Sequence, residues 1–391
     1  MKIGKLVQEG AITIKTGPFG TQLKAAEYQE TGTPVLNVKN LGYGSINPAK
    51  LDHLGPATVE RLRIHLLQQG DIVFGRKGAV DRHAYIDNES DGWMQGSDCI
   101  RLRVETDVIN PRFLSYYFLT AQHKAFMISM CSHGTTMASL NQKILEQIDF
   151  PCPERKYQDK IVDVLERIDE KGRINRKINE NLFQQAQALY KYRFVNMQPF
   201  DGVMPGNWHL GTVSEIIELH DSKRIPLSSR ERADLSKIYP YYGATSVMDY
   251  VDSYLFDGIY LLLGEDGTVV DSKGFPILQY VEGKFWVNNH AHIITGKNGF
   301  SVELLYLLFS LTSVQSIVTG AVQPKISQAN LNKVPVIVPS EDELKAFDTT
   351  VQPIFAQIRN LRAENDRLAT IRDTLLPKLM SGELDVSELD L

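Results

Sequence analysis

The chain has 391 residues, enough for two domains of ordinary size, with 43% hydrophobic residues, 23% charged residues and three cysteines in no paired motif. This composition excludes a membrane span, a disulfide framework and a zinc ribbon. The N-terminus lacks the apolar centre of a signal peptide, so we expect a cytoplasmic protein. The net charge of −5 argues against a free-standing nucleic-acid binder, because phosphate neutralisation supplies much of the affinity of such proteins.

Along the chain, one short motif occurs twice. Residues 71–80 read DIVFGRKGAV, a strand that runs into a glycine-framed turn, and residues 260–269 read YLLLGEDGTV, 189 positions later (260 minus 71). Gly75 and Gly78 of the first copy have glycine counterparts in the second. In both halves the turn is followed by an apolar helix, a proline-bounded strand and a long helix. This order of elements predicts a duplicated α/β unit.

A direct shift of the sequence supports the duplication. Moving the chain by 186 residues keeps Gly134 to Phe194 in register with the second half and gives ten identities over those 61 positions. The predicted divisions are 1–153 for the first globular domain, 154–198 for a central helical region, 199–339 for the second globular domain, and 340–391 for a distal helical region with the C-terminal tail.

Two long helices are predicted, one after Pro153 and one after Pro339. In the second helix, apolar residues follow a 4-3 spacing that is typical of a coiled-coil seam, whereas the first helix has a more polar middle. Pro353 should kink the second helix or divide off its first turns.

Each seam contains an asparagine near its centre, at Asn179 and Asn365. We expect the two helices to pack antiparallel, with these side chains meeting near a pseudo-twofold axis, because a lone seam asparagine fixes register. The alternative is that both asparagines face solvent. The fold class predicted is α+β: two similar globular α/β domains separated by two long antiparallel coiled-coil helices, with pseudo-twofold symmetry.

The predicted geometry indicates a function in recognising two DNA half-sites. A helix of about 40 residues is ~60 Å long, so an antiparallel pair would carry its two domains at opposite ends. Duplex DNA has the same twofold symmetry, and paired half-sites lie ~34 Å or a multiple apart. Such a protein would measure two short sequences across a constant gap.

No catalytic motif is present in the sequence. There is no Pro-Pro dipeptide of the kind an amino-methyltransferase needs, no Walker A loop, no HExxH and no GxSxG. His290 and His292 would form half of a metal site, but no acidic or cysteine partner lies nearby in the sequence. Glu265 and Asp266 are explained as a solvated turn. We therefore predict no catalytic residues and no metal site.

Five further segments are TGPFGTQLK (16–24), GDIVFGRKG (70–78), PERKYQDKIVDVLERID (153–169), AVQPKISQANLNKVPVIVP (321–339) and RDTLLPKLMSGEL (372–384). Together they resemble one known family, the DNA-specificity subunits of type I restriction–modification systems. The resemblance spans essentially the whole chain. Pro353 and the acidic second half are departures from the pattern.

The resemblance implies two target recognition domains, each reading half of a bipartite site on double-stranded DNA. It also implies that two separate methyltransferase (M) subunits dock on the helical regions and methylate adenine N6, and that two restriction/translocase (R) subunits join them where such a subunit exists. No cofactor is expected in this chain, since S-adenosylmethionine, and ATP with Mg for restriction, serve the partners. No membrane contact is expected.

The two copies of the turn differ at their tips. Arg76 and Lys77 offer donors suited to guanine or phosphate, whereas Glu265 and Asp266 offer acceptors suited to the cytosine N4 amine. The hypothesis is that the two turns present different chemistry to different half-sites. The alternative is a charged, exposed turn that contacts nothing.

Other candidate DNA contacts are polar residues on loops between predicted strands, although each taken singly is also explained as a surface residue. With the turn residues, the first-domain set is Thr16, Lys24, Lys39, Asn40, Arg76, Lys77, Arg82, His83, Gln95, Ser97, Thr135 and Thr136. The second-domain set is Lys223, Arg224, Tyr241, Tyr242, Thr245, Ser246, Lys273, Asn288, Asn289, Gln323 and Lys325.

Two other functions compete with DNA reading. A coiled-coil scaffold whose paired domains bind protein would have the same duplicated geometry. An enzyme with an unrecognised site is disfavoured by the lack of any convergent motif. The bases read, the spacer length and the existence of a restriction partner do not follow from the residues.

Overall fold

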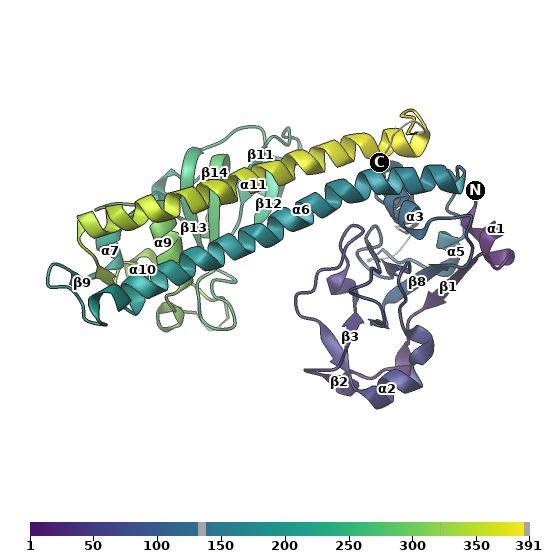
Figure 1. The fold of residues 1–391 in the computed structure, drawn as a ribbon, viewed down its shortest axis with the longest axis horizontal. Helices are drawn as coiled ribbons and strands as arrows, with labels where there is room; N and C mark the ends of the chain where they lie inside the picture. Colours follow the sequence, from purple (N-terminus) through teal and green to yellow (C-terminus); the bar gives the residue numbers. More distant parts are fainter. Residues whose placement is uncertain (132–137, 321, 387–391) are drawn as a thin grey trace. The chain divides into compact units, whose positions relative to one another are not determined.

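The computed structural model describes residues 1–131, 138–320 and 322–386. The chain divides into two compact units, one made of Met1–Gly172 with Asp366–Leu391 and the other of Arg173–Asn365. Each unit contains one globular domain and a portion of each of two long helices, α6 (Arg155–Tyr190) and α11 (Glu341–Ser381), coloured teal and yellow in Figure 1.

The globular part of the first unit has two four-stranded sheets. One has the order β1-β8-β5-β6, formed by Ile12–Thr16, Cys99–Val104, Ile72–Gly75 and His83–Tyr85. The other has the order β2-β4-β3-β7, formed by Tyr28–Gln29, Asp52–Leu54, Thr33–Leu36 and Met94–Gln95. All pairs are antiparallel except β3 with β7. The helices are α1 (Ile3–Gln8), α2 (Pro56–Arg61), α3 (Pro111–Tyr117), α4 (Ala121–Cys131) and α5 (Gln142–Leu145).

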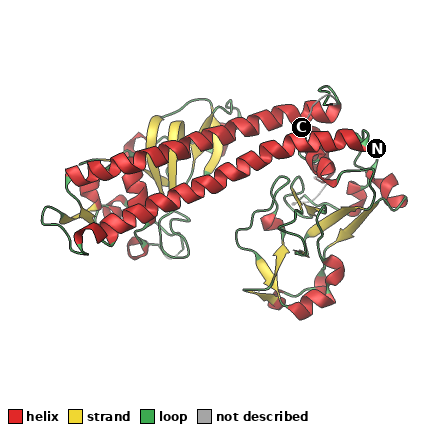
Figure 2. Cartoon of the chain, in the orientation of Figure 1, coloured by secondary structure: helices red, strands yellow, loops and turns green. Residues whose placement is uncertain are grey.

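The globular part of the second unit has one six-stranded and one two-stranded sheet (Figure 2). The larger has the order β10-β15-β13-β14-β11-β12, formed by Ile217–Leu219, Ala291–Gly296, Phe256–Gly264, Leu278–Val287, Tyr239–Tyr242 and Val247–Val251. The smaller pairs β16 (Pro335–Val338) with β9 (His209–Thr212). The helices are α7 (Val213–Ile216), α8 (Ser229–Ala233), α9 (Val302–Ser310) and α10 (Gln328–Leu331).

The two globular parts share a common strand pattern. The antiparallel series β1-β8-β5 of the first unit corresponds to β10-β15-β13 of the second. Each domain also has one parallel pair, β3 with β7 and β11 with β14. The repeated motif therefore lies on matching strands, β5 and β13, as the duplication predicts.

The apolar runs of β5 and β13 are buried because each strand lies between two cores. Ile72 and Phe74 enter the core beneath α3, whereas Val73 points into a smaller core on the opposite face. In the second unit, Leu261 and Leu263 pack in the core that contains α9. The intervening Leu262 packs on the other face. Since successive side chains of a strand point to opposite faces, an unbroken apolar run is the pattern that two covered faces require.

The long helices pack antiparallel within each unit. In the first unit, Leu165 of α6 shares a core with Leu379 of α11. In the second, Ala186 of α6 shares a core with Val351 and Phe355 of α11. Asp169 also pairs with Arg372 at 3.2 Å in the first unit, and Asn175 bonds to Asn365 at 3.1 Å in the second. Within each unit the residue number therefore falls along α11 as it rises along α6, and the antiparallel prediction is confirmed.

The asparagine partner differs from the prediction by one helical turn. In the second unit, the amide of Asn175, which is fully buried, donates to Asn365 at 3.1 Å and to Glu364 at 2.7 Å. The Oδ1 atom of Asn179 is buried and has no hydrogen-bond partner among the described residues. Asn365 therefore bonds to Asn175 and not to Asn179. The seam spacing predicted which face of α6 is buried but not which of two successive asparagines would meet the partner.

Pro353 does not divide the second long helix, since α11 runs unbroken from Glu341 to Ser381. The proline ring is exposed, while Val351 and Phe355 on either side of it are fully buried in the core of the second unit. This packing holds the helix through a residue that would otherwise end it. Within the described part of the chain, no helix is both long and apolar enough to cross a membrane.

Candidate nucleic-acid interface

Several connections of the first domain meet at one edge of its sheets. Strands β1, β3, β5 and β7 end there and β8 begins there. The backbone joins them: Gly17 donates to Cys99 at 2.9 Å, and Gly96 donates to Leu36 at 3.0 Å. We call this set the first loop edge, made of residues 17–24, 37–45, 76–82, 96–98 and 138–142.

The second domain has a matching edge. Strands β10, β11, β13 and β14 end there and β15 begins there. The amide of Asn288 donates to Tyr242 at 3.0 Å, and that of His220 donates to Ile293 at 2.9 Å. We call this set the second loop edge, made of residues 220–227, 243–246, 265–268, 288–290 and 322–328.

The repeated turn of the first domain is held by three backbone hydrogen bonds. Arg76 donates to Asp98 at 2.8 Å and accepts from Leu140 at 2.8 Å. Gly78, whose φ is +74°, donates to Ala138 at 2.9 Å. The turn is therefore tied to two other loops of the edge and its tip has a defined position.

The turn of the second domain is held in the same way. Glu265 donates to His290 at 2.8 Å and accepts from Ile326 at 2.8 Å. Gly267, with a φ of +86°, donates to Pro324 at 3.0 Å. Each bond matches one in the first domain, so both domains present the turn on equivalent backbone, as predicted. The left-handed φ explains why the second glycine of the motif is present in both copies.

The side chains at the two tips behave differently. Arg76 is half-buried and Lys77 is exposed, and in the described part of the chain neither forms an ion pair. Glu265 is turned inward: its carboxylate accepts from Arg224 at 2.6 Å and lies 3.2 Å from the ammonium group of Lys325.

The hypothesis that Glu265 and Asp266 contact cytosine is therefore wrong for this conformation. The Glu265 side chain is only 13% exposed, and its oxygens already have charged partners. Asp266 is paired with the imidazole of His290. A carboxylate that is mostly buried and already paired with charged groups is poorly placed to accept from a base edge.

Charged groups inside the second edge continue from Glu265 to a buried histidine. His292 is fully buried, with Nδ1 2.6 Å from Asp221 and Nε2 2.8 Å from the carbonyl oxygen of Ile326. Burial by itself would raise the pKa of Asp221, but hydrogen bonds, that of His292 first, outweigh it and hold the pKa below its ordinary value. The Arg224 hydrogen bond does the same to the pKa of Glu265 against the opposing effect of burial.

These groups correct the sequence-based view of the histidines. Acidic partners do lie near His292, because Asp221, Glu265 and His292 bring ligand atoms within 4.8 Å of one another. They come from segments distant in the sequence, which is why none was visible there. His290 instead pairs with Asp266. Both nitrogens of His292 are hydrogen-bonded within the protein, and Arg224 and Lys325 together compensate the two carboxylates, so the cluster has a structural explanation without an ion.

Three predicted contacts of the first domain are buried and hold the fold together. The Asn40 amide donates to the carbonyl oxygens of Asn47 and Ala49 at 3.1 and 3.2 Å. The imidazole of His83 bonds to Ser115 at 2.9 Å, and burial lowers its pKa to about 3. Gln95 donates to main-chain carbonyl oxygens on β1 and β8. These side chains cannot reach DNA in this conformation, so the prediction is wrong for them.

Two predicted contacts of the second domain are buried in the same way. Tyr241 is 1% exposed, and its hydroxyl accepts from the Leu227 amide at 2.9 Å. Asn288 is 4% exposed, and its amide group lies 3.1 Å from the sulfur of Met248. Tyr241 thus joins β11 to the segment 220–227, and Asn288 joins the segment 288–290 to β12, so neither side chain is free to contact bases.

Most of the other candidates do lie on the two edges. On or beside the first are the exposed Lys24, Lys39, Lys77 and Arg82, and the half-buried Thr16, Arg76 and Ser97. On the second are the exposed Lys223, Thr245, Ser246, Asn289, Gln323 and Lys325, and the half-buried Arg224; Tyr242, also half-buried, ends β11 beside it. Lys273 lies on a separate turn whose Gly274 meets Ser313 and Gln315. Thr135 and Thr136 lie outside the described residues.

The structure adds residues that loop polarity did not indicate. Tyr43, on the first edge, is 46% exposed, with Arg82 5.6 Å and Lys124 4.4 Å from its ring centre. On the second edge, Val322 is 99% exposed. Exposed aromatic and apolar side chains in loops are the signal that could have found them, because such groups suit contact with bases.

Both the whole chain and its two halves are similar to known proteins. Residues 12–184 and 205–369 match the family model described as the type I restriction modification DNA specificity domain. The chain is 25% identical over 315 residues to the specificity subunit of the type I restriction enzyme MjaIX of Methanocaldococcus jannaschii, a match that covers 73% of this chain and 72% of that protein.

Two further similarities are shorter or more distant. The putative type I restriction enzyme specificity subunit S.HindORF215P of Haemophilus influenzae is 32% identical over 127 residues, or 32% of each chain. The crystal structure of the S subunit of a type I restriction–modification system from M. genitalium aligns with 99% of this chain and 96% of that chain, with a TM-score of 0.51 and 18% identity. The last similarity shows a shared fold.

Proposed function

This chain belongs to the type I restriction–modification DNA-specificity family, and from that premise we propose that it supplies the target sequence to such a system. Each globular domain reads one half of a bipartite site on double-stranded DNA, with a constant spacer between the halves. The loop edges face the DNA, and their exposed side chains contact base edges and phosphates. The alternative of a scaffold that binds only proteins is not favoured.

One observation supports this proposal above the others. The two loop edges share the backbone of the repeated turn, hydrogen bond for hydrogen bond, but carry different side chains at its tip. A common backbone lets both domains approach the duplex in the same way, because the duplex has the same form at each half-site. Different side chains then allow the two half-sites to differ in sequence.

The chemistry belongs to partner subunits in this proposal. Two methyltransferase (M) subunits bind the helical regions and use S-adenosylmethionine to methylate adenine N6 within the target. Where a restriction/translocase (R) subunit exists, two copies join the complex and use ATP and Mg for cleavage. The specificity chain itself binds no cofactor, is not catalytic, has no membrane contact and works in the cytoplasm. Its sequence contains none of the tested catalytic motifs.

The direct test is to co-express the chain with its methyltransferase subunits and to map adenine methylation across a genome. The proposal expects one split motif with a constant gap. A stable complex without a methylation motif, or a chain that binds neither subunit nor DNA, would favour the scaffold.

A domain-resolved version of the test separates the half-sites. The double substitution Thr245→Ala with Ser246→Ala changes two exposed hydroxyl side chains of the second loop edge. We expect it to relax one half of the motif and leave the other half and the gap unchanged. Lys273→Ala is the matched control, because Lys273 is exposed in the same domain but lies on the separate turn. If the double variant altered both halves, the two domains would not read separately.

A further inference from the structure

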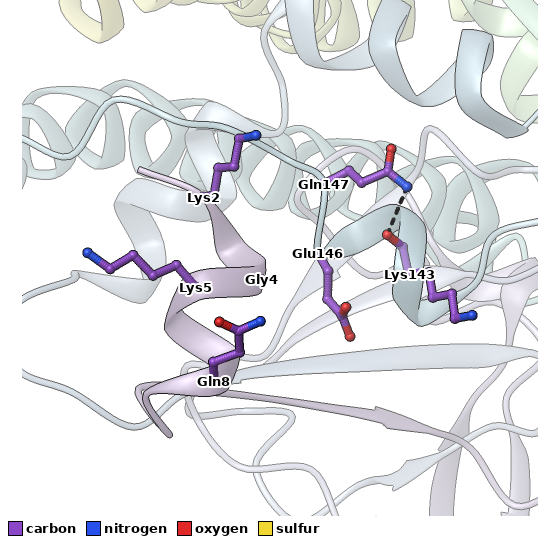
Figure 3. Close-up of a pocket in the computed structure, with 7 residues that line it drawn as sticks. All are labelled: Lys2, Gly4, Lys5, Gln8, Lys143, Glu146 and Gln147. Atoms are coloured by element: carbon purple, nitrogen blue, oxygen red, sulfur yellow. Dashed lines mark hydrogen bonds between the residues drawn. The ribbon is translucent and has the colours of Figure 1, made fainter.

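A shallow basic groove lies between α1 and α5 of the first domain, outside the first loop edge (Figure 3). Its volume is about 470 Å³, and its lining includes Lys2, Lys5, Lys143 and Glu146. Three lysines and one glutamate give the groove a net charge of +2. Figure 3 shows the three ammonium groups at separate points around the rim and not gathered on one spot. This spacing suits a row of negative groups better than one small anion.

The lysines of the groove have little use within the protein. Lys2 and Lys143 are exposed and form no ion pair with any described residue. Lys5 lies 3.7 Å from Glu9, but both side chains are more than half exposed, and such pairs contribute little. The positive charge is therefore available to a ligand.

The groove is joined to the first loop edge through α5. The residue before Lys143 is Gln142, whose amide donates to the hydroxyl of Thr16 at 3.2 Å. Just before α5, Leu140 donates to the carbonyl oxygen of Arg76. The far side of the groove is attached to the C-terminal end of α5, since Gly4 donates to the carbonyl oxygen of Glu146 at 2.8 Å. One end of α5 therefore borders the first loop edge and the whole helix borders the groove.

The second domain has the same backbone here without the charge. The hydrogen bond from Gly4 to Glu146 matches that from Ser214 to Asn332, so α1 corresponds to α7 and α5 corresponds to α10. The positions that correspond to Lys2, Lys5 and Lys143 are, in the same order, Thr212, Glu215 and Ala329.

That replacement removes the charge and puts a carboxylate there that bonds within its own domain. The carboxylate of Glu215 accepts from the Thr212 amide at 2.8 Å and lies 3.0 Å from the imidazole of His209. The fold therefore does not require lysines at these positions, and their presence in the first domain needs a separate explanation.

The geometry points to a second DNA contact in the first domain: Lys2, Lys5 and Lys143 bind backbone phosphates of the duplex that flanks the half-site read by the first loop edge. This inference rests on the proposed function. Duplex DNA continues beyond any short target and carries one charge per about 1.7 Å of its axis, so a basic strip beside the reading edge meets phosphates whatever the sequence. The contact adds affinity and no base preference.

The test uses the full chain in complex with its methyltransferase subunits, and a duplex that carries the mapped target with flanks of about 15 base pairs, roughly one and a half helical turns. The variant is Lys2→Gln, Lys5→Gln and Lys143→Gln together. A plot of log affinity against log salt concentration has a negative slope, and each lost phosphate contact makes that slope less steep by about 0.9. Three contacts give about 2.7, so between about 50 and about 200 mM salt the unmodified complex should lose about 40-fold more affinity than the variant.

Two controls separate this contact from other effects. Lys50→Gln, Lys284→Gln and Lys297→Gln together remove the same charge from exposed sites outside the groove and its counterpart in the second domain, and should leave the slope unchanged. Shortening the flank on the side of the first half-site should abolish the difference between the variant and the unmodified complex, whereas shortening the other flank should not. The methylation motif should be the same in all complexes.

Three results would overturn the inference. An unchanged salt slope, or a change that does not depend on the first flank, would show that the groove does not bind DNA. If the triple variant failed to assemble with the methyltransferase subunits when no DNA is present, the lysines would be shown to contact an acidic face of a partner subunit. If the unmodified complex itself showed no sequence-specific binding, the proposed function would fail together with this inference, and that outcome is visible before any variant is made.

Discussion

The two loop edges differ in charge although they share a backbone. The first carries five basic and two acidic side chains, a net charge of +3, whereas the second carries three of each and is neutral. On the first edge, Arg76 and Lys77 have no ionic partner among the described residues. On the second, Glu265 takes Arg224 and Lys325 as partners. The comparison teaches that the fold positions the turn, while the pairing of side chains decides what the turn can offer to DNA.

The difference in charge pairing gives the two edges different roles, one in DNA affinity and the other in the stability of its own domain. Unpaired cations on the first edge are available to phosphates, so the first domain is expected to supply more of the salt-dependent affinity. Paired charges on the second edge stabilise their own domain and leave neutral groups such as Thr245 and Asn289 for reading.

The largest effect is expected from Arg224→Ala. Arg224 and Glu265 are only 14% and 13% exposed, and breaking a buried ion pair leaves a charge without compensation. The free energy of unfolding of the second unit should fall by about 3 kcal/mol. Hydrogen exchange followed by mass spectrometry over β13 and β15 measures it.

The matched control for this change lies on the other edge. Arg76→Ala removes an arginine that has no ionic partner, so the stability of the first unit should change by less than about 0.5 kcal/mol. Similar losses from the two substitutions would contradict the difference in pairing.

The next effect concerns DNA. Arg76→Ala should weaken binding to the mapped target by about 1–3 kcal/mol, or roughly 5- to 150-fold, if the guanidinium contacts guanine or phosphate. Fluorescence anisotropy of a labelled duplex measures the affinity, and methylation mapping shows whether one half of the motif is relaxed. Lys273→Ala serves as the control. Unchanged affinity together with an unchanged methylation target would remove Arg76 from the interface.

Acid should act on the second edge in particular. The pKa values of Asp221 and Glu265 are lowered in the folded protein. Carboxylates of this kind contribute stability above their unfolded pKa values, about 4, and lose it as pH falls through the lower folded values. The second unit should therefore unfold more readily as the pH falls below about 4. Hydrogen exchange over β13 at a series of pH values measures this loss.

The acid effect has its own check. In Arg224→Ala, one source of the lowered pKa of Glu265 is missing, so the second unit should depend less steeply on pH. Arg76→Ala should retain the pH dependence of the unmodified chain. An identical pH dependence in both variants would show that the cluster does not govern acid stability.

The smallest effects test the shared backbone itself. Gly78 and Gly267 have φ values of +74° and +86°, and an added Cβ at either would meet no atom within 4 Å. Gly78→Ala and Gly267→Ala should therefore cost only the strain of a left-handed residue, about 1–2 kcal/mol each. Equal losses in the two units, measured by hydrogen exchange, would confirm that the turns are equivalent, and a clear inequality would refute it.

Sequence reasoning predicted the features that depend on local patterns. The repeated glycines predicted two equivalent turns, and the apolar runs before them predicted strands. The seam spacing predicted antiparallel long helices within each unit. The resemblance to DNA-specificity subunits is confirmed by the family match.

It failed where the outcome depends on which distant segments meet. The partners of Glu265 are 41 residues earlier and 60 residues later in the chain, at Arg224 and Lys325, and no local pattern indicates them. Tyr241 is polar and lies near a loop, yet a main-chain amide at Leu227 takes its hydroxyl. Residue type shows that a side chain can bond to a base. It does not show whether the protein has already used that bond.

The covered faces of β5 and β13 have a consequence for how such a protein acquires a new target. Ile72 and Phe74 fill one core and Val73 the other, so no side of the strand tolerates a change of size without a cavity or a clash. Substitutions that alter specificity while keeping the domain folded must then fall on the connections at the strand ends. A change of target then requires only the exchange of short surface segments on an unchanged sheet. Each half-site of the target can therefore change in sequence without any change in the other.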